Sequence, residues 1–466
     1  MGRKKQVLET QRTDLSVQQE RAVLVRVLLP DSARVFGDPL AELASLADTA
    51  GACVVDRITQ RRTRCDPALY VGKGKAEEIR DRAKANNADV IIFDNDLSPA
   101  QIRGLEEATA SKVVDRSELI LDIFASRAQT HQARLQVELA QLQYTAPRLR
   151  GMWTHLERIA GAGGGTGVGA VGGIGTRGPG ERQIEIDRRI VGKRISALKR
   201  KLDEIDRRKV REIKSRSDCF CVSLVGYTNA GKSTLLNALT GGSQLVEDKL
   251  FATLDTKTRR WELGQGRPVL LSDTVGFISD LPHHLVASFR ATLEETIHAD
   301  LLLHVVDASS PEADAQRTVV DEVLAELGCQ DVPTLVLLNK IDAVTDEAVV
   351  GIVERAADDS LRVSARTGQG LDQLVDRVCG ILQGRFVRAT IEVPAGAGKA
   401  LAMIDRHARI LDRRYNGDAV QLDVSIDRAE LDRIRERHTC VHVVADAPSS
   451  DRPAPPAPAA SRANVR

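Results

Sequence analysis

The first part of the chain, residues 20–116, alternates short apolar runs with segments of helical periodicity. Apolar runs of about four to eight residues are typical of buried strands, and apolar positions three and four apart are typical of amphipathic helices. The predicted strands are 22–29, 52–58 and 88–96, and the predicted helices are 38–51, 74–86 and 97–109. Strands that alternate with helices form βαβ units, so this part is expected to be an α/β domain around a mostly parallel sheet.

From residue 117 the pattern changes to long helices. Two narrow apolar stripes, spaced by three and four residues, predict helices that pack side by side. Their members are Leu135, Leu139 and Leu142 in the first stripe and Val191, Ile195, Leu198, Leu202 and Ile205 in the second. Between them lies 161–180, where eleven of twenty residues are glycine, a composition that supports no regular element. We therefore predict a long antiparallel helical hairpin over 117–216, tipped by the Gly-rich segment.

The hairpin also concentrates positive charge. Residues 127–216 hold 20 Lys and Arg against 9 Asp and Glu, a net charge of +11 in a chain whose total is +1. Such a distribution indicates a polyanion partner, although a solvated coiled-coil surface explains the charge equally well. The predicted tip is flanked by Arg148 and by aromatic and guanidinium groups that suit stacking on unpaired bases. The candidates for RNA contact are Arg150, Trp153, Arg158, Arg177 and Arg182. The alternative is a passive flexible linker.

Length and composition restrict the class of protein. The chain has 466 residues, of which 42% are hydrophobic and 28% charged, which is typical of a globular protein with several domains. No apolar run is long enough to span a membrane, and the polar leader 1–19 has no apolar stretch behind its basic residues. The seven cysteines lack paired spacing and favour reduced thiols. We expect a cytoplasmic protein, with association with ribosomes or a membrane surface left open.

A phosphate-binding motif opens the next segment, 217–385. Residues 226–233 read Gly-Tyr-Thr-Asn-Ala-Gly-Lys-Ser, between a predicted strand over 219–225 and a predicted helix over 234–239. This is the GxxxxGK[ST] loop in its required strand–loop–helix context. Backbone N–H groups of such a loop face phosphate oxygens. We expect Lys232 to bridge the β- and γ-phosphates and Ser233 to ligate Mg²⁺.

A second motif, Asp273-Thr274-Val275-Gly276, follows the apolar run 269–271. The Asp273 carboxylate is expected to hold Mg²⁺, and the Gly276 N–H is expected to sense the γ-phosphate. The DxxG pattern is weak alone, and its position after a buried strand gives it weight.

Two further motifs point to guanine. Asn339-Lys340-Ile341-Asp342 follows a predicted strand over 334–338, and Ser364-Ala365 follows another over 361–363. A carboxylate at Asp342 accepts the two N–H donors on the guanine edge, which adenine lacks, so this residue is predicted to select GTP over ATP. A backbone N–H at Ser364-Ala365 is expected to meet the guanine carbonyl oxygen. Each motif is weak singly, whereas four in order after strands are strong.

This stretch resembles a translation-factor-type GTPase domain, and more narrowly the HflX family of GTPases. The residues that carry the narrower resemblance are 70–75 (YVGKGK), 152–155 (MWTH), 175–181 (GTRGPGE), 250–255 (LFATLD) and 273–277 (DTVGF), within roughly residues 20–385. It implies an N-terminal α/β domain, a helical hairpin, a P-loop GTPase domain with a mostly parallel sheet, and binding to the large ribosomal subunit and its RNA. It also implies a role in splitting stalled or idle ribosomes under stress.

The resemblance assigns further roles at the site. Thr253 takes the position of the first-switch threonine that completes the Mg²⁺ shell, so the expected metal ligands are Ser233, Thr253 and Asp273, and the expected catalytic residues are Lys232, Thr253 and Gly276. The residues expected to contact GTP or GDP are Gly226, Tyr227, Thr228, Asn229, Ala230, Gly231, Lys232, Ser233, Thr234, Phe251, Ala252, Thr253, Asp273, Thr274, Val275, Gly276, Asn339, Lys340, Asp342, Ser364 and Ala365.

Phe277 departs from a common GTPase pattern. Many GTPases carry a glutamine there that orients the attacking water, which an aromatic ring cannot do by hydrogen bonding. Hydrolysis is therefore expected to be slow until a partner supplies polar groups, and the ribosome is the hypothesised activator.

The rest of the chain carries no chemical motif. Residues 386–447 predict a small α+β domain with a hairpin turn at Asn416-Gly417, and 448–466 predicts a disordered Ala- and Pro-rich tail. Three alternatives remain open for the whole protein, which is expected to be monomeric when free: a subunit-assembly GTPase, a nucleotide-gated RNA-binding scaffold, and a P-loop ATPase.

Overall fold

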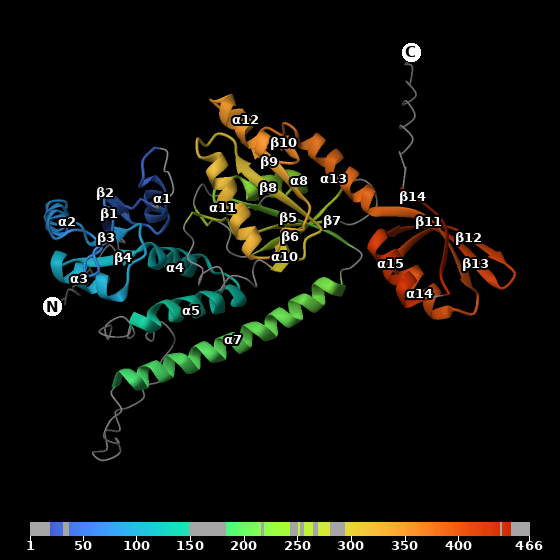
Figure 1. Ribbon diagram of the computed structural model, residues 1–466, viewed down its shortest axis with the longest axis horizontal. Coiled ribbons are helices and arrows are strands. Elements are labelled where there is room, and N and C mark those ends of the chain that lie inside the picture. Colours follow the sequence, from blue (N-terminus) through green and yellow to red (C-terminus); the bar gives the residue numbers. More distant parts are fainter. Residues whose placement is uncertain are drawn as a thin grey trace, which may run out of the picture.

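The structure of the chain is a computed structural model with three sheets (Figure 1). It describes residues 19–30, 37–148, 183–215, 219–242, 250–251, 256–263, 269–279, 294–438 and 440–448. The Gly-rich segment 161–180, most of the tail predicted over 448–466 and nearly all of the leader 1–19 lie outside these residues.

The N-terminal sheet is parallel throughout, as the alternation of strands and helices predicts. Its strand order is β2-β1-β3-β4, and its strands are β1 (Arg21–Leu28), β2 (Cys53–Arg61), β3 (Val90–Phe93) and β4 (Lys112–Asp115). Alternate residues of β1 face opposite sides, with Val23 and Val25 in one apolar cluster and Ala22 and Leu24 in another. Helices therefore cover both faces.

Four helices provide that cover, and they divide into two pairs. The helices are α1 (Ala41–Thr49), α2 (Lys73–Ala85), α3 (Pro99–Thr109) and α4 (Arg116–Arg127). Residues of α2 and α3 join the cluster of Val23, whereas residues of α1 and α4 join the cluster of Ala22. Ser98 caps α3 as predicted, because its side chain accepts from the Gln101 N–H in a capping box with Pro99 in the first turn.

Helix α4 lies within the segment where the sequence predicts the hairpin. Most of its residues are buried, and its apolar side chains pack with α1 against the N-terminal sheet. The two helices that do form a pair are α5 (His131–Thr145), which continues into the short η1 (Ala146–Arg148), and α7 (Gln183–Ser215). Their shared apolar cluster contains Leu135, Leu139, Leu198 and Leu202, all members of the predicted stripes.

The pair is antiparallel. Arg194 of α7 forms an ion pair of 2.6 Å with Glu138 of α5. Farther along, Asp206 accepts from Gln132 at 3.4 Å. The residue number on α7 rises as that on α5 falls, which is the geometry of a hairpin. Figure 1 shows α7 as a long helix along the lower side of the molecule.

The central sheet is the one that carries the phosphate loop. Its order is β10-β9-β8-β5-β7-β6, and every strand pair is parallel except the antiparallel pair of β6 and β7. The strands are β5 (Phe220–Gly226), β6 (Lys257–Trp261), β7 (Val269–Asp273), β8 (Leu301–Asp307), β9 (Thr334–Asn339) and β10 (Ser360–Arg362). Trp261, at the end of β6, is buried in the core and serves packing.

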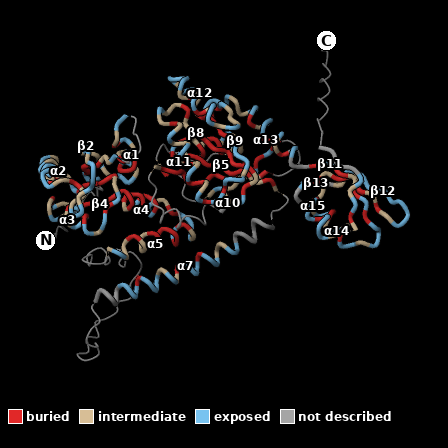
Figure 2. The backbone as a smooth tube through the Cα atoms, in the orientation of Figure 1, coloured by how far each residue is buried: buried red, intermediate tan, exposed pale blue. Residues whose placement is uncertain are grey.

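Within the described residues, five helices and one short 3₁₀ segment accompany this sheet. They are α8 (Lys232–Thr240), α10 (Glu294–Ile297), α11 (Ala313–Glu326), η2 (Ile341–Ala343), α12 (Glu347–Ala356) and α13 (Leu371–Arg385). In Figure 2 the buried positions concentrate along β5, β8 and β9, so the middle of the sheet forms the core. The mostly parallel P-loop fold is thus confirmed.

The C-terminal unit is a small antiparallel sheet with two helices, as predicted. Its order is β12-β13-β11-β14, and its elements are β11 (Phe386–Pro394), α14 (Gly398–His407), β12 (Ala408–Asn416), β13 (Ala419–Asp427), α15 (Arg428–Arg437) and β14 (His442–Pro448). Residues 417–418 connect the hairpin of β12 and β13. Its apolar cluster is drawn from this unit alone.

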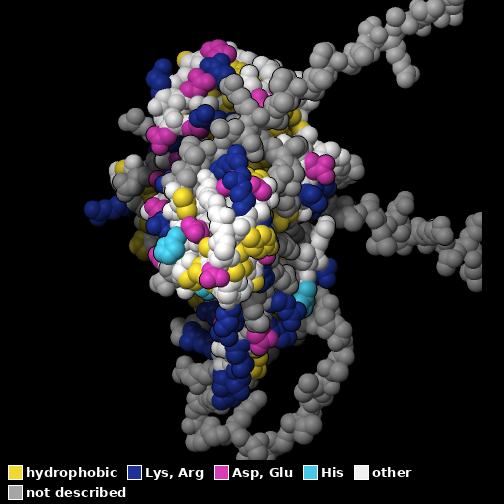
Figure 3. All heavy atoms as spheres, turned by 90° about the vertical axis from the view of Figure 1, so that its right-hand side faces the viewer, with side chains coloured by type: hydrophobic (Ala, Val, Ile, Leu, Met, Phe, Trp, Pro, Cys, Tyr) yellow, Lys and Arg dark blue, Asp and Glu magenta, His cyan; other side chains and the backbone are white. Residues whose placement is uncertain are grey.

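None of the helices within the described residues is both long and apolar enough to cross a membrane. Figure 3 shows Lys and Arg side chains gathered on the lower part of the molecule, at the height where α7 lies in Figure 1.

Candidate nucleotide-binding site

The predicted motifs converge at one edge of the central sheet. Strands β5, β7 and β9 end at Gly226, Asp273 and Asn339, and the Ser364-Ala365 motif follows β10. Because these strands are parallel, their carboxyl ends meet at the same edge, which is where α/β sheets bind ligands.

Two glycines allow the phosphate loop to approach its neighbours closely. Gly226 has φ of 150°, and a Cβ there would lie 2.2 Å from the Val305 carbonyl oxygen. Gly231 has φ of 95°, and a Cβ there would lie 2.3 Å from Nδ2 of Asn339. A side chain at either position is excluded, so the loop can curl over the start of α8 at Lys232 with its N–H groups available to phosphate.

Lys232 is buried inside the loop. Its Nζ donates to the carbonyl oxygens of Gly226 at 3.0 Å and Tyr227 at 2.7 Å. Burial lowers its pKa to about 8, and the nearby Asp273 carboxylate opposes that shift. The ammonium is thus held at the loop's centre. A phosphate there would stabilise the positive charge that burial destabilises.

The predicted metal ligands Ser233 and Asp273 are adjacent. Ser233 Oγ donates to Asp273 Oδ2 at 2.6 Å, and Asp273 is fully buried at the end of β7. Thr274 faces the other way, since its hydroxyl donates to the Leu224 carbonyl. Hydroxyl and carboxylate oxygens are hard donors of the kind that Mg²⁺ prefers, so the pair fits that ion. No group of three or more His, Cys, Asp or Glu side chains with metal-site geometry occurs among the described residues.

Asn339 ties the base-recognition motifs to the phosphate loop. Its Nδ2 donates to the Ala230 carbonyl at 2.8 Å, and its Oδ1 accepts from the Ala365 N–H at 3.0 Å. The side chain is fully buried. Its amide therefore fixes the position of the phosphate loop relative to the loop that contains Ala365.

Asp342, the residue predicted to recognise the base, is held in place by its neighbours. Its carboxylate accepts from Ser364 Oγ at 2.7 Å and pairs with the Arg366 guanidinium. The Ser364 hydrogen bond, helped by Arg366, holds the pKa of Asp342 below its usual value and keeps it an acceptor. The Lys340 side chain forms an ion pair of 2.7 Å with Asp307 at the end of β8. This arrangement can receive the donors of a guanine edge.

The segment that follows Asp273 and contains Gly276, Phe277 and Ser279, here called the second switch, is in direct contact with the phosphate loop. The Thr228 N–H donates to the Phe277 carbonyl at 2.7 Å, and the Phe277 N–H donates to the Gly226 carbonyl at 3.2 Å. The Phe277 ring is buried in an apolar cluster with Val225 and Leu302. The ring is therefore core packing and does not orient water.

The first switch is described only at its edges. Phe251 lies in the left-handed region at φ of 54°. Its ring packs edge to face on the Phe124 ring, with the two ring centroids 4.6 Å apart. It is thus packed in the core of the N-terminal unit. Ala252 and Thr253 lie outside the described residues.

The RNA-contact candidates Arg150, Trp153, Arg158, Arg177 and Arg182 also lie outside the described residues. Arg148, expected beside the tip, packs over the Tyr144 ring at 3.3 Å from its centroid. It also donates to Asp115 at 3.1 Å and so holds η1 against the N-terminal unit.

Sequence reasoning missed a group of residues that joins the N-terminal unit to the site. Tyr227, at a variable position of the phosphate loop, donates to Glu42 of α1 at 2.5 Å and accepts from the Ser279 N–H at 2.7 Å. Arg116 of α4 donates to the Ser279 carbonyl at 2.8 Å. No local pattern at Glu42 or Arg116 signals this contact.

Four family models match successive parts of the chain. They are described as GTP-binding GTPase N-terminal (residues 37–125), GTP-binding GTPase Middle Region (127–216), 50S ribosome-binding GTPase (221–340) and HflX C-terminal domain (351–443).

Among curated proteins, the GTPase HflX of Lacrimispora saccharolytica is 45% identical over 414 residues, covering 88% of this chain and 94% of that protein. The GTPase HflX of Escherichia coli K12 is 43% identical over 383 residues, covering 82% and 87%. A crystal structure of SsGBP in complex with GDP aligns with a TM-score of 0.45 at 24% identity, over 78% of this chain and 98% of that one. On its curated relatives and the models matched along its length, the chain belongs to the HflX family of GTPases and is a GTP hydrolase.

Proposed function

We propose that this GTPase binds the large ribosomal subunit and dissociates stalled or idle ribosomes under stress, in the cytoplasm, with GTP hydrolysis stimulated by the ribosome. The observation that carries the proposal is one chain that joins a nucleotide site to a long basic hairpin. Two findings support it: the model matched over 221–340 is that of a 50S ribosome-binding GTPase, and the curated relatives are HflX proteins.

The nucleotide contacts follow from the geometry of the site. Loop N–H groups and Lys232 bind the phosphates, with the ammonium turning from the carbonyls of Gly226 and Tyr227 to the β- and γ-oxygens. The Asp342 carboxylate accepts from the guanine edge, and the Ala365 N–H, which donates to Asn339 Oδ1 in this structure, turns to the guanine carbonyl.

Ser233 and Asp273, with Thr253 as the first-switch ligand, would hold Mg²⁺ in this proposal. When bound, the ion neutralises charge on the β- and γ-phosphates. The Gly276 N–H binds the γ-phosphate. Lys232, Thr253 and Gly276 are therefore the proposed catalytic residues.

Slow intrinsic hydrolysis follows from the burial of Phe277. With its ring packed in the core, this position cannot align the attacking water. A group supplied by a partner can raise such a rate by ~10³ to 10⁵. We assign the activating role to the large subunit.

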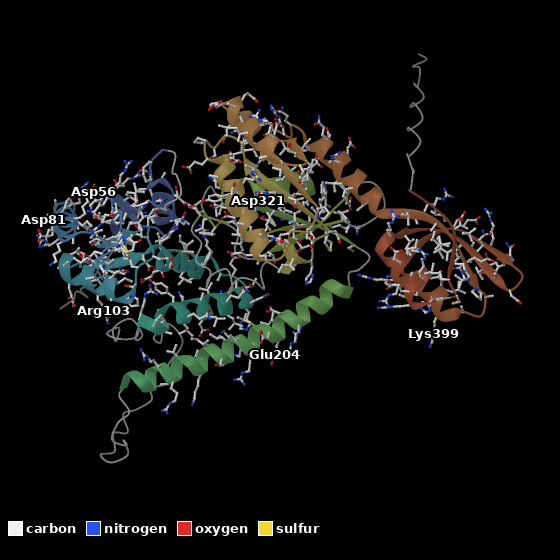
Figure 4. All side chains as sticks on the ribbon, in the orientation of Figure 1. Asp56, Asp81, Arg103, Glu204, Asp321 and Lys399 are labelled. Carbon is white, nitrogen blue, oxygen red and sulfur yellow. The ribbon has the colours of Figure 1, made fainter. Side chains whose placement is uncertain are left out.

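The hairpin supplies the RNA-binding surface. Among the described side chains of α7, the exposed Lys and Arg residues are Arg188, Arg189, Lys193, Arg194, Lys199, Arg200, Lys201, Arg207 and Arg208. Within that described part of α7, the exposed acidic side chains are Asp203 and Glu204, the latter labelled in Figure 4. The proposed base-stacking contacts come from the tip, through Arg150, Trp153, Arg158, Arg177 and Arg182.

The deciding experiment measures GTP turnover with and without purified large subunits at two salt concentrations. Stimulation that weakens at higher salt, together with conversion of joined ribosomes to free subunits in a sucrose gradient, supports the proposal. Stimulation without dissociation would favour a subunit-assembly GTPase. Unchanged turnover, with RNA binding that survives loss of Lys232, would favour a nucleotide-gated scaffold.

A charge-removal variant tests the hairpin's part. Replacing Lys199, Arg200 and Lys201 by Gln is expected to weaken large-subunit binding and to reduce its logarithmic salt slope by about 2 to 3, because each phosphate contact contributes ~0.7 to 0.9. The matched control replaces Lys73, Lys84 and Arg103, which are exposed on α2 and α3 (Arg103 is labelled in Figure 4). Equal slopes in both triple variants would contradict the role of α7.

A further inference from the structure

A polar network links the N-terminal unit to both the phosphate loop and the second switch. The Tyr227 hydroxyl donates to Glu42, and Ser279 Oγ donates to the same carboxylate. Arg116 forms an ion pair of 3.0 Å with Glu42 and donates to the Ser279 carbonyl at 2.8 Å. Ser279 stands three residues after Gly276, so the network holds the segment that senses the γ-phosphate.

This network is built into the interior. The Arg116 side chain is 2% exposed, and its guanidinium also pairs with Asp94 at 2.5 Å. Burial by itself raises the pKa of Glu42, but Arg116 and the hydrogen bonds from Ser279 and Tyr227 hold that pKa below its usual value. Burial and the Glu42 charge raise the pKa of Tyr227. Glu42 is thus anionic and Tyr227 is a donor at neutral pH.

Apolar contacts extend the same interface. Val275 and Ile278, on either side of the Gly276-Phe277 pair, join the core cluster that contains Phe124 and Leu43 of the N-terminal unit. Phe251, at the edge of the first switch, belongs to the same cluster. The second switch and Phe251, at the described edge of the first, are therefore anchored on the N-terminal unit.

In this arrangement the second switch lies against the phosphate loop. A Cβ added to Gly276 would lie 2.8 Å from Thr228 Cγ2 and 3.0 Å from Lys232 Nζ. A γ-phosphate binds between that lysine and that glycine's N–H. Gly276 therefore packs directly against the phosphate loop beside the Lys232 ammonium. GTP brings a γ-phosphate to this contact, whereas GDP does not, so only GTP acts on the contact between the second switch and the loop.

We propose that Glu42 and Arg116 are positioning residues that latch the second switch onto the phosphate loop and so set the preference between GTP and GDP. In the closed state, in which the latch is formed, the protein binds GDP. GTP binds the open state, so the apparent GTP affinity equals the affinity of the open state multiplied by the fraction of molecules that are open. The inference requires guanine-nucleotide binding and is independent of ribosome dissociation.

The test compares affinities for a fluorescent GDP and a fluorescent non-hydrolysable GTP analogue, with Mg²⁺, in the full-length chain. Glu42→Gln removes the charge that Arg116 and Ser279 meet, and Ser279→Ala removes one hydrogen bond to it. Each is expected to tighten analogue binding, by about tenfold for Glu42→Gln, the equivalent of one charge-assisted hydrogen bond, with GDP affinity unchanged within about twofold.

Glu78→Gln is the matched control. Glu78 is a half-exposed carboxylate of the N-terminal unit, and its ion-pair partners Lys75 and Arg82 belong to the same helix, α2. Its two affinities are expected to equal those of the unmodified chain. A fall in analogue affinity, or an equal change for both nucleotides, in Glu42→Gln would overturn the latch, and so would unchanged affinities. Absence of any nucleotide binding by the unmodified chain would instead refute the nucleotide site itself.

Discussion

At the scale of single residues, Lys232 is a buried cation at the centre of the phosphate loop. Two backbone carbonyls are its only hydrogen-bond partners among the described residues. Burial lowers its pKa from 10.5 to about 8, so the charged form of Lys232 costs the folded protein stability. That cost favours binding of the anion that relieves it.

This cost predicts a pH dependence of stability. The folded pKa is below the unfolded value, so between pH 8 and 10.5 the unfolded chain binds more protons and stability rises with pH. Below pH 8 the full penalty, about 3 kcal/mol, is present. Denaturant unfolding without nucleotide should show the free energy of unfolding of the native chain rising by about that amount relative to Lys232→Met between pH 7 and 10.5. Parallel pH profiles of the two proteins would contradict the prediction.

Asp342 is predicted to determine the choice of base. Asp342→Asn replaces an acceptor by a donor, so GDP affinity should fall by about a hundredfold or more, because the guanine donors lose their partner. Xanthine nucleotides, which carry a carbonyl where guanine carries an amino group, should bind better than before. Titration with both nucleotides measures this.

The control for that change is Asp346→Asn, since Asp346 accepts from the Ala348 N–H at the start of α12 and is not part of the motif. It should leave base preference unaltered. Preserved preference for guanine in Asp342→Asn would show that another group reads the base.

At the scale of elements, α7 owes its position to a narrow leucine seam. Leu198 is fully buried between α5 and α7, whereas Ile190 of the same helix is 59% exposed. The other described contacts between the two helices are polar, such as the ion pair of Arg194 with Glu138, so the seam supplies the apolar contact that holds α7 against α5.

Truncation in that seam should release the helix. Leu198→Ala is expected to lower local stability by about 2 to 5 kcal/mol, from lost burial and the cavity left behind. Hydrogen exchange of α7 amides should accelerate, and large-subunit binding should weaken. Ile190→Ala should change neither by much, because its side chain is already in water. Equal exchange rates in the two variants would disprove the role of the seam.

At the scale of the whole molecule, the apolar clusters define which parts are coupled. The cluster around Phe124 contains side chains of the N-terminal unit together with Phe251, Val275 and Ile278 from the switches. The cluster of the C-terminal sheet contains residues from 387 onward only. The N-terminal unit and the unit of the central sheet should therefore be destabilised together by a mutation in the shared cluster. The C-terminal unit should not be affected.

Phe251→Ala tests this coupling. Loss of the buried ring is expected to destabilise both the N-terminal sheet and the switch regions, by about 3 to 5 kcal/mol in total. Peptide-resolved hydrogen exchange should show faster exchange in β1, β3 and β7, with β11 and β13 unaffected. Unchanged protection in β1 and β3 would mean that the two units are not coupled through this ring.

The sequence alone was sufficient to predict that the motifs lie at the ends of strands and that the leucine stripes pack together. Asn339 and Ser233 were predicted because phosphate and base recognition need particular groups at short, fixed spacings next to strand ends. Leu198 was predicted because helical periodicity marks a buried stripe whatever covers it. Periodicity could not tell that the buried helix at 116–127 packs on the N-terminal sheet, because the pattern records burial and not the partner.

Only the tertiary structure decided how the nucleotide site is connected to the rest of the molecule. Glu42 and Ser279 are 237 residues apart, and nothing in either neighbourhood identifies the other. Local chemistry determines what a loop can bind, since it acts through adjacent atoms. Which surfaces of folded units meet depends on the shape and charge of whole faces, which exist only once the chain has folded.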